Sequence, residues 1–264
     1  MRILGIDTAG PASNVALIDG ERVLAVLYRW HPPAFSRQIL RFIDIILRQE
    51  ELCLDDLDGL AVNVGPGTFT GIRIGLATAQ GLALASNKPL VGCNALEALA
   101  ASVSGWHGPI CPVLEARHGE VYVALYCREG AVVRELMPGM VLSATALGTY
   151  ITERTLFVGS GVRTYEHVFT ATLGERAVCA IDVEAGSALR IARLAQIRLT
   201  YAESEPRAVP QPLYIRPADA RLPRHLQAAK HSSTPSRAPA YAVGVLSPER
   251  QEGGVPCSMA SMKR

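Results

Sequence analysis

The chain has 264 residues, enough for one large domain or two of ordinary size, and its 49% hydrophobic and 19% charged residues allow a sizeable core. A net charge of +2 gives no reason to expect a nucleic-acid partner, and no stretch is apolar enough to predict a membrane span. The start, MRILGIDTAG, lacks the apolar region of a signal peptide, and the six cysteines form no C-x-x-C pair, so we expect reduced thiols in a cytoplasmic protein.

Residues 1–104 predict a meander of strands followed by alternating helices and strands. The hairpin expected over residues 14–28 turns at Asp19-Gly20, a favoured two-residue turn. This order is typical of a mixed sheet flanked by helices. The expected strands are 2–7, the hairpin 14–28, 59–65 and 89–92, and the expected helices are 34–51, 70–86 and 94–103.

The pattern partly restarts after residues 104–108, which indicates a second half over 105–220. Two strands are expected to meet at a His118-Gly119 turn, as in a second meander. The chain therefore has the organisation of two related halves. The expected elements of the second half are strands 109–116, 120–127, 131–137 and 155–158, and helices 143–152, 162–170 and 187–202.

From about residue 221 the chain is rich in Ser, Pro, Ala and Gly and has no sustained period. Residues 221–264 carry 7 Lys and Arg against 2 Asp and Glu, whereas residues 1–220 carry 19 against 22. The positive net charge of the chain therefore comes from this tail. We expect 221–264 to be a disordered basic segment that leaves the folding of the rest intact.

The stretch NVGPGTFTGIRIGLATAQGLALA (63–85) places glycines before and inside a helix. It lacks the Lys of a P-loop and has Thr70 where the Rossmann pattern needs glycine. Thr68 or Thr70 can cap the helix, and free N–H groups there can bind an anion. Gly71, Gly75 and Ala79 lie on one helix face, where small residues allow close packing. We favour close packing, with an anion site as the alternative.

Helices 34–51 and 70–86 are more apolar than a surface helix needs to be. The apolar residues of the first cover an arc of roughly 160°, against a little over 100° for an ordinary surface helix. The excess predicts a protein interface, and the alternative is a first half that wraps both helices itself. The expected interface residues are Ile39, Phe42, Ile43, Ile46, Gly71, Gly75 and Ala79.

Four stretches together resemble the bacterial TsaB (YeaZ) family: ILGIDTA, GPGTFTGIRIGLATAQGLALA, ARHGEVYVALY and PLYIRPADA. The resemblance runs in order over residues 1–220. It implies an α/β protein with the duplicated actin/Hsp70-like ATPase (ribonuclease H-like) fold, in which two half-domains each hold a mixed sheet flanked by helices. It also implies a role in making threonylcarbamoyladenosine in tRNA.

TsaB is similar to its catalytic partner TsaD, whose motif N-H-L-E-G-H holds a metal through two histidines on one helix face. The matching stretch here is NALEAL (94–99), with Ala95 and Leu99 at the two histidine positions. Methyl and isobutyl groups cannot coordinate a metal. We therefore expect no metal and no catalytic residues.

Asp7-Thr8 ends the first strand, at a turn that faces nucleotide phosphates in the actin-like fold. The resemblance implies a vestigial nucleotide site at Asp7, Thr8, Gly67 and Thr68, and a capping aspartate in a turn is the simpler alternative. We expect no cofactor, with ATP binding kept open. In the second half, Glu115 replaces the aspartate common in the family. We read the nearby Arg117, His118 and Glu120 as hairpin-end charges facing solvent.

The resemblance implies a non-catalytic subunit that dimerises with TsaD, activates it and helps form the surface for the ATPase TsaE. TsaD would transfer the threonylcarbamoyl group to N6 of adenosine 37 in tRNAs that read codons beginning with A. This chain would meet tRNA indirectly through that complex, with a contact from the basic tail as the alternative to a solvated tail, and no membrane is expected. The alternatives are an ATPase or metallopeptidase-like enzyme of the same fold, and a self-associating scaffold that forms homodimers.

Overall fold

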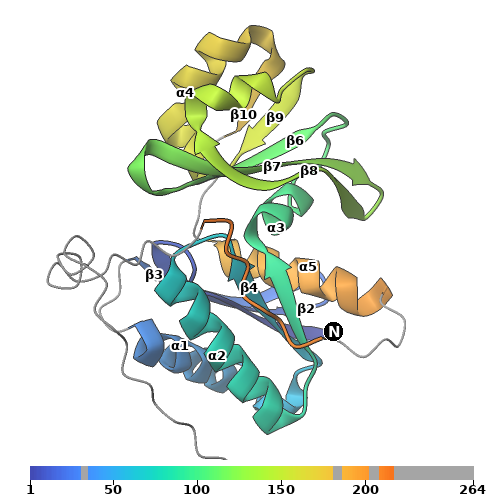
Figure 1. The fold of residues 1–264 in the computed structure, drawn as a ribbon. Helices are drawn as coiled ribbons and strands as arrows, with labels where there is room; N and C mark the ends of the chain where they lie inside the picture. Colours follow the sequence, from blue (N-terminus) through green and yellow to red (C-terminus); the bar gives the residue numbers. More distant parts are fainter. Residues whose placement is uncertain (31–34, 181–185, 202–207, 217–264) are drawn as a thin grey trace, which may run out of the picture. The chain divides into compact units, whose positions relative to one another are not determined.

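The computed structural model describes residues 1–30, 35–180, 186–201 and 208–216 (Figure 1). Within these residues the chain forms two five-stranded sheets, each flanked by helices. Both sheets combine parallel and antiparallel pairs, so the predicted α/β class with a repeated mixed sheet is confirmed. The predicted tail, 221–264, lies outside the described residues.

The first sheet begins with the predicted meander. β1 pairs antiparallel with β2, and β2 with β3, while Gly20, at φ 59°, lies in the turn between β2 and β3. Two further strands add in parallel on the other side of β1, which gives the order β3-β2-β1-β4-β5. The strands are β1 (Arg2–Asp7), β2 (Ala12–Asp19), β3 (Arg22–Trp30), β4 (Gly59–Gly65) and β5 (Leu90–Asn94).

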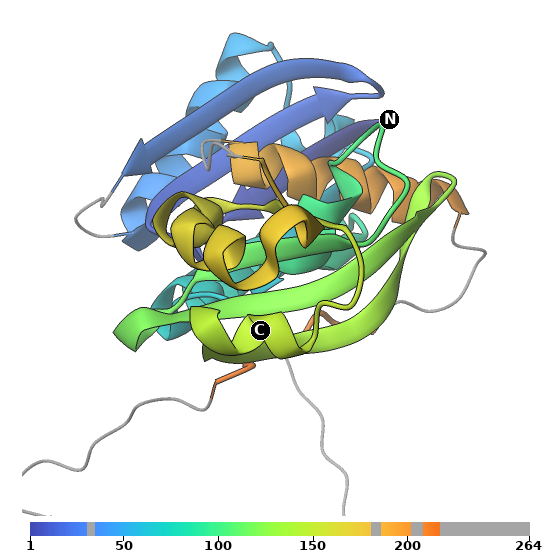
Figure 2. The same ribbon diagram turned by 90° about the horizontal axis from the view of Figure 1, so that it is seen from above.

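Helices cover both faces of the first sheet (Figure 1, Figure 2). α1 (Phe35–Gln49) and α2 (Phe69–Ser86) pack against one face, where Leu4 and Ile6 of β1 point. α5 (Ser187–Tyr201) packs against the opposite face, where Ile3 points. The alternation along β1 is the period of two expected of a strand that is buried on both faces.

The second sheet repeats the plan of the first, with strand order β10-β9-β6-β7-β8. α4 (Ser160–Leu173) packs on one face, and α3 (Ala95–Ala101) contributes Leu96 and Leu99 to the core on the other. The predicted helix 143–152 is a short 3-10 helix, Ala144–Thr149, and β10 was not predicted. The strands are β6 (Ile110–Glu115), β7 (Glu120–Glu129), β8 (Val132–Ser143), β9 (Thr155–Val158) and β10 (Ala177–Ala180).

The sheet on which α5 packs is not the one that precedes α5 in the sequence. Its residues follow the second sheet, yet Ile191, Ala192 and Ala195 pack with strands of the first. The Arg198 guanidinium also donates to the Gly92 carbonyl oxygen at 2.7 Å and to the Glu97 carboxylate. By packing, this part of the predicted second half therefore belongs to the first sheet. Residues 1–218 group into one compact unit, and the division at 104–105 stays a prediction.

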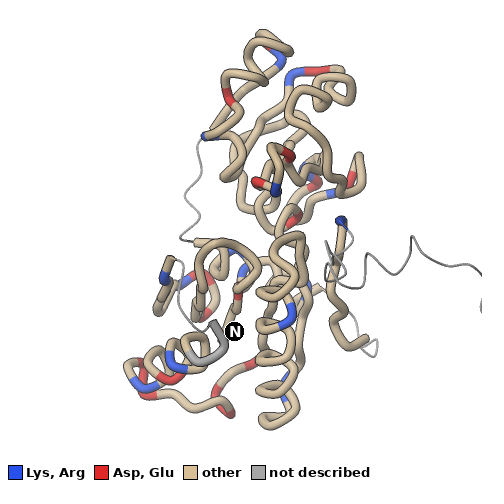
Figure 3. The backbone as a smooth tube through the Cα atoms, turned by 60° about the vertical axis from the view of Figure 1, so that its left-hand side comes forward, with Lys and Arg blue, Asp and Glu red and all other residues tan. Residues whose placement is uncertain are grey.

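Charged residues are interspersed along both halves of the described backbone (Figure 3). Ion pairs such as Arg48 with Asp44 on α1, at 2.8 Å, lie at exposed positions and contribute little to stability. None of the helices in the described part of the chain combines the length and the apolar content needed to cross a bilayer. The cytoplasmic location stays a prediction.

The five described cysteines are free, and we expect their reactivity to follow their burial. Burial raises the pKa of the Cys93 thiol to about 12 and raises that of Cys111 as well. Since the thiolate is the reactive form, both should resist iodoacetamide at pH 8, whereas the exposed Cys53 should react. Mass spectrometry of the labelled protein tests this order. Labelling of Cys93 as fast as Cys53 in the folded protein would contradict it.

Candidate functional site

The Gly-Pro-Gly turn joins β4 to α2 and brings the helix against the turn between β1 and β2. The Thr68 backbone N–H donates to the Ala9 carbonyl oxygen at 2.7 Å, and a Cβ at Gly67 would lie 2.5 Å from that same oxygen. Thr68 caps α2 by accepting from the Gly71 N–H at 3.2 Å. Of the two predicted N-cap candidates, Thr68 and Thr70, the helix uses Thr68.

The glycines inside α2 allow this close approach. A Cβ at Gly71 would overlap the carbonyl oxygen of Thr8, and one at Gly75 would lie 2.6 Å from Thr8 Oγ1. The Thr8 hydroxyl donates to the Gly71 carbonyl oxygen at 2.6 Å. Ala79, on the same face, is fully buried. The preference for close packing is therefore confirmed, and the packing partner is the chain's own β1–β2 turn.

The four residues of the predicted nucleotide site lie together around this turn. Asp7 and Thr8 are buried, and Asp7 Oδ1 accepts from the Ala9 N–H and from Asn63 Nδ2, both at 2.9 Å. Thr8 is engaged with α2, and Gly67 and Thr68 contact Ala9. Their bonds are thus internal to the fold. Whether a nucleotide binds stays a prediction.

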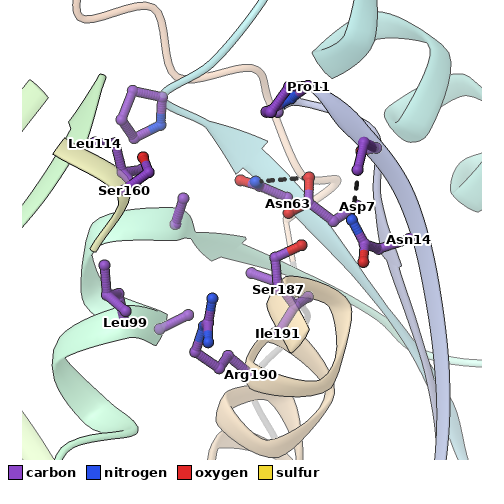
Figure 4. A pocket seen from close by; sticks show the side chains of 15 residues that line it. Asp7, Pro11, Asn14, Asn63, Leu99, Leu114, Ser160, Ser187, Arg190 and Ile191 are labelled. Atoms are coloured by element: carbon purple, nitrogen blue, oxygen red, sulfur yellow. Dashed lines mark hydrogen bonds between the residues drawn. The ribbon is translucent and has the colours of Figure 1, made fainter. Parts of the chain in front are cut away.

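A cavity of about 70 Å³ lies beside Asp7 (Figure 4). Its polar residues come from several elements: Asp7, Asn14 and Asn63 from the first sheet, Ser160 from α4, and Ser187 and Arg190 from α5. Apolar side chains form the rest of the wall. They are Pro11, Ala12, Pro66, Ala95, Ala98, Leu99, Leu114 and Ile191, with Gly10 beside them.

Sequence reasoning found only Asp7 among the polar residues of this cavity. Asn14 is the register partner of Asp7 across the β1–β2 pair, so a polar residue opposite a strand-end aspartate was an available signal. Ser160 and Ser187 are each the first residue of a helix. A helix start in the sequence does not indicate which distant residues lie beside it. Their convergence depends on long-range packing.

Ala95 and Leu99, the positions at which TsaD has metal-binding histidines, are in the wall of this cavity. Both are apolar, and Leu99 is 3% exposed. In the described ranges, no three His, Cys, Asp or Glu side chains gather in a way that could hold a metal ion. The wall can exclude water and contact apolar groups, and it offers no metal ligand at these two positions.

At the turn between β6 and β7, Arg117 and His118 are exposed, as predicted for hairpin-end charges. Glu120 differs, because it is half-buried and forms an ion pair with Arg216. Glu115 is hydrogen-bonded to the Thr164 hydroxyl on α4. Its longer carboxylate therefore has a structural contact inside the second half.

The four predicted interface residues of α1 are all core residues. Ile39 and Ile46 are 0% exposed, Ile43 is 4% and Phe42 is 8%, and all four belong to the cluster under the first sheet. The expectation that some of them face outward is wrong, because the sheet and α2 together cover the wide apolar arc. Gly71, Gly75 and Ala79 are likewise buried inside the chain. Any interface on these helices must use other residues.

We expect aspartate at Ile39, Phe42, Ile43 or Ile46 to unfold the protein in each case. A buried, unpaired carboxylate costs several kcal/mol, against a total stability of about 5–15 kcal/mol for an ordinary domain. The control is Leu40→Asp on the same helix, because Leu40 is 51% exposed. Circular dichroism with urea unfolding measures both. A folded Ile43→Asp protein of nearly unchanged stability would contradict the assignment to the core.

The outer face of α2 is exposed and nearly uncharged. Its exposed residues recur every three or four positions, and Leu84 is 86% exposed. A Cβ added at Gly81 would meet nothing within 4 Å, so this part of the face is open. We call the following set the α2 stripe: Thr70, Arg73, Ala77, Gly81, Leu84 and Ala85.

The extended segment 208–216 borders the start of the α2 stripe. Tyr214 stacks on Phe69 with ring centroids 5.1 Å apart, and its hydroxyl accepts from Arg73 Nε at 3.0 Å. The Arg73 guanidinium lies over the Phe69 ring at 3.7 Å from its centroid. Leu213 N–H donates to the Val64 carbonyl oxygen at 2.8 Å. These contacts form an aromatic and cationic cluster at the start of the α2 stripe.

Comparison with known families gives a match over most of the chain. The family model of TsaD, tRNA N6-adenosine threonylcarbamoyltransferase, matches residues 32–221. The chain is similar to the tRNA threonylcarbamoyladenosine biosynthesis protein TsaB of Haemophilus influenzae, with 30% identity over 82% of this chain and 94% of that protein. It is 40% identical to TsaB of Escherichia coli over 49% of this chain, a match that spans 56% of that relative's length.

Solved structures agree on the fold. YeaZ of Pseudomonas aeruginosa is 24% identical, with a TM-score of 0.60 over 75% of this chain and 93% of that one. A ROK hexokinase of Thermus thermophilus is 10% identical, with a TM-score of 0.52 over 76% of this chain and all of the other. The two mixed sheets and these likenesses establish the predicted duplicated actin/Hsp70-like ATPase fold.

Proposed function

This chain belongs to the TsaB (YeaZ) family, and we propose that it acts in the biosynthesis of threonylcarbamoyladenosine in tRNA as a non-catalytic subunit. In this proposal it pairs with TsaD and holds TsaD in an active shape. TsaD performs the transfer to N6 of adenosine 37, and the pair offers a surface to the ATPase TsaE. Contact with tRNA is then through the complex.

The observation that carries the non-catalytic role is the apolar wall of the cavity. Ala95 and Leu99 stand where the resemblance to TsaD requires two imidazoles, and neither side chain has a lone pair for a metal. The Thr8 hydroxyl also donates to the Gly71 carbonyl oxygen of α2, so it is engaged within the fold. Both features argue against the ATPase and metallopeptidase-like alternatives.

We assign the surface for TsaD to the α2 stripe. Small residues at Ala77, Gly81 and Ala85 let another helix approach closely, and Leu84 is a large apolar side chain that no element of the described chain covers. Arg73 and its aromatic neighbours supply a polar rim. An apolar centre with a polar edge is the usual anatomy of a protein interface. A homodimer through the same stripe is the competing arrangement.

The test is reconstitution with TsaD. We expect the two purified proteins to elute together with the mass of a heterodimer by light scattering. With TsaE present, formation of threonylcarbamoyladenosine, measured by mass spectrometry of nucleosides, should require this chain. Full tRNA modification without this chain would refute its role as a required subunit. A stable homodimer that does not bind TsaD would favour the self-associating scaffold.

A further inference from the structure

One wall of the cavity beside Asp7 holds a buried hydrogen-bond acceptor, Asn14 Oδ1, that has no donor. Asn14 is 2% exposed, and its Oδ1 has no hydrogen-bond partner. Both described bonds of the Asp7 carboxylate are at Oδ1, and Asn63 Nδ2 holds it in place. An unsatisfied buried acceptor is costly, so this wall calls for a group with N–H donors.

The opposite wall presents hydrogen-bond donors and a positive charge. Ser160 is the first residue of α4, and its preceding N-cap residue, Gly159, gives no side-chain cap to the N–H groups of the first turn. Ser187 begins α5, and Arg190 lies one turn further along the same helix (Figure 4). Helix N-termini, a hydroxyl and a guanidinium together favour a carboxylate.

Size and apolar lining restrict the ligand further. At 10–15 Å³ for each water-sized volume, a cavity of about 70 Å³ holds about five to seven such volumes. Leu99, Leu114 and Ile191 form an apolar surface between the two polar walls. The space fits a molecule with an ammonium group, a carboxylate and a short side chain.

We propose that this cavity is a binding site for a small α-amino acid. Its ammonium group would donate to Asp7 and Asn14, its carboxylate would lie at the first turns of α4 and α5, and its side chain would contact Leu99. A zwitterion leaves the net charge of the site unchanged. A ligand with only an anionic group would be repelled by the Asp7 carboxylate, and a ligand with only a cationic group would be repelled by the Arg190 guanidinium.

The experiment is isothermal titration calorimetry on the full chain. The probes are L-alanine, L-serine and L-threonine, with propionate and ethylamine as fragments that lack one charged group. We expect at least one of these amino acids to bind ten times more tightly than either fragment, and L-phenylalanine to be excluded by size. Amino acids that bind no better than the fragments would overturn the proposal.

Two variants locate the binding. Asn14→Leu removes the unsatisfied acceptor and should keep the fold, and Ser187→Ala is a milder change at the other wall. Each should weaken binding about tenfold or more, while Ser86→Ala, a hydroxyl change on α2, should not. Wild-type binding by both cavity variants, or ADP binding that Asn14→Leu abolishes, would overturn the proposal. Either failure leaves the pairing with TsaD untouched, because that surface is on α2.

Discussion

Replacing Gly71 with alanine is expected to lower the free energy of unfolding by about 3 kcal/mol or more, whereas the same change at Gly81 should raise it by about 0.5–1 kcal/mol. At Gly71 the new methyl group would overlap the Thr8 carbonyl oxygen. That oxygen belongs to the backbone where β1 ends, so it cannot rotate away. Relief requires α2 to move off the sheet, which breaks the Thr8–Gly71 hydrogen bond.

Gly81 is the matched control because it lies on the same helix with open space around it. There the substitution only replaces a poor helix former with the best one. Urea unfolding followed by circular dichroism gives both free energies, with unchanged slopes showing that the same surface is exposed on unfolding. Equal and small effects at the two positions would mean that the close packing of α2 is wrong.

Replacing Ala77 with arginine is expected to abolish pairing with TsaD while the protein stays folded. Ala77 is exposed at the centre of the α2 stripe, so the monomer tolerates a long side chain. In the proposed complex the guanidinium would be buried without a partner, at a cost of several kcal/mol. Since each 1.4 kcal/mol is about tenfold in affinity, a loss of about 1000-fold is expected.

The matched control is Ala171→Arg, which places the same charge on the exposed face of α4. It should bind TsaD like the unmodified chain. Light scattering and calorimetry measure pairing, and circular dichroism checks the fold of each variant. Undiminished binding by Ala77→Arg would move the interface away from α2. Equal loss with Ala171→Arg would point to a general effect of charge.

Much of the fold could be predicted from the sequence because local patterns decide it. The Asp19-Gly20 turn, the alternation in β1 and the small residues of α2 each have a local physical cause. The wide apolar arc of α1 also follows from its sequence, but the arc alone does not show whether the same chain or a partner protein covers it. A helix wedged between a sheet and a neighbouring helix needs the same arc as one at an interface.

Most polar residues of the cavity could not be predicted from the sequence, for a related reason. The cavity's polar residues come from β1, β2, β4, α4 and α5, and long-range packing, including that of α5 on the first sheet, brings them together. The helical period of 187–202 shows that a helix forms and gives no information about which sheet it covers. Residues such as Ser187 and Arg190 therefore had no signal in the sequence.

The position of α5 also sets the order in which the protein can be completed on the ribosome. One apolar face of the first sheet, with Ile3, Ile18 and Val91, is covered by residues near the end of the described chain. That face stays uncovered until the whole second sheet has been translated and α5 has emerged. The nascent chain thus carries an open hydrophobic surface through most of its synthesis, a period in which chaperones have a natural binding site.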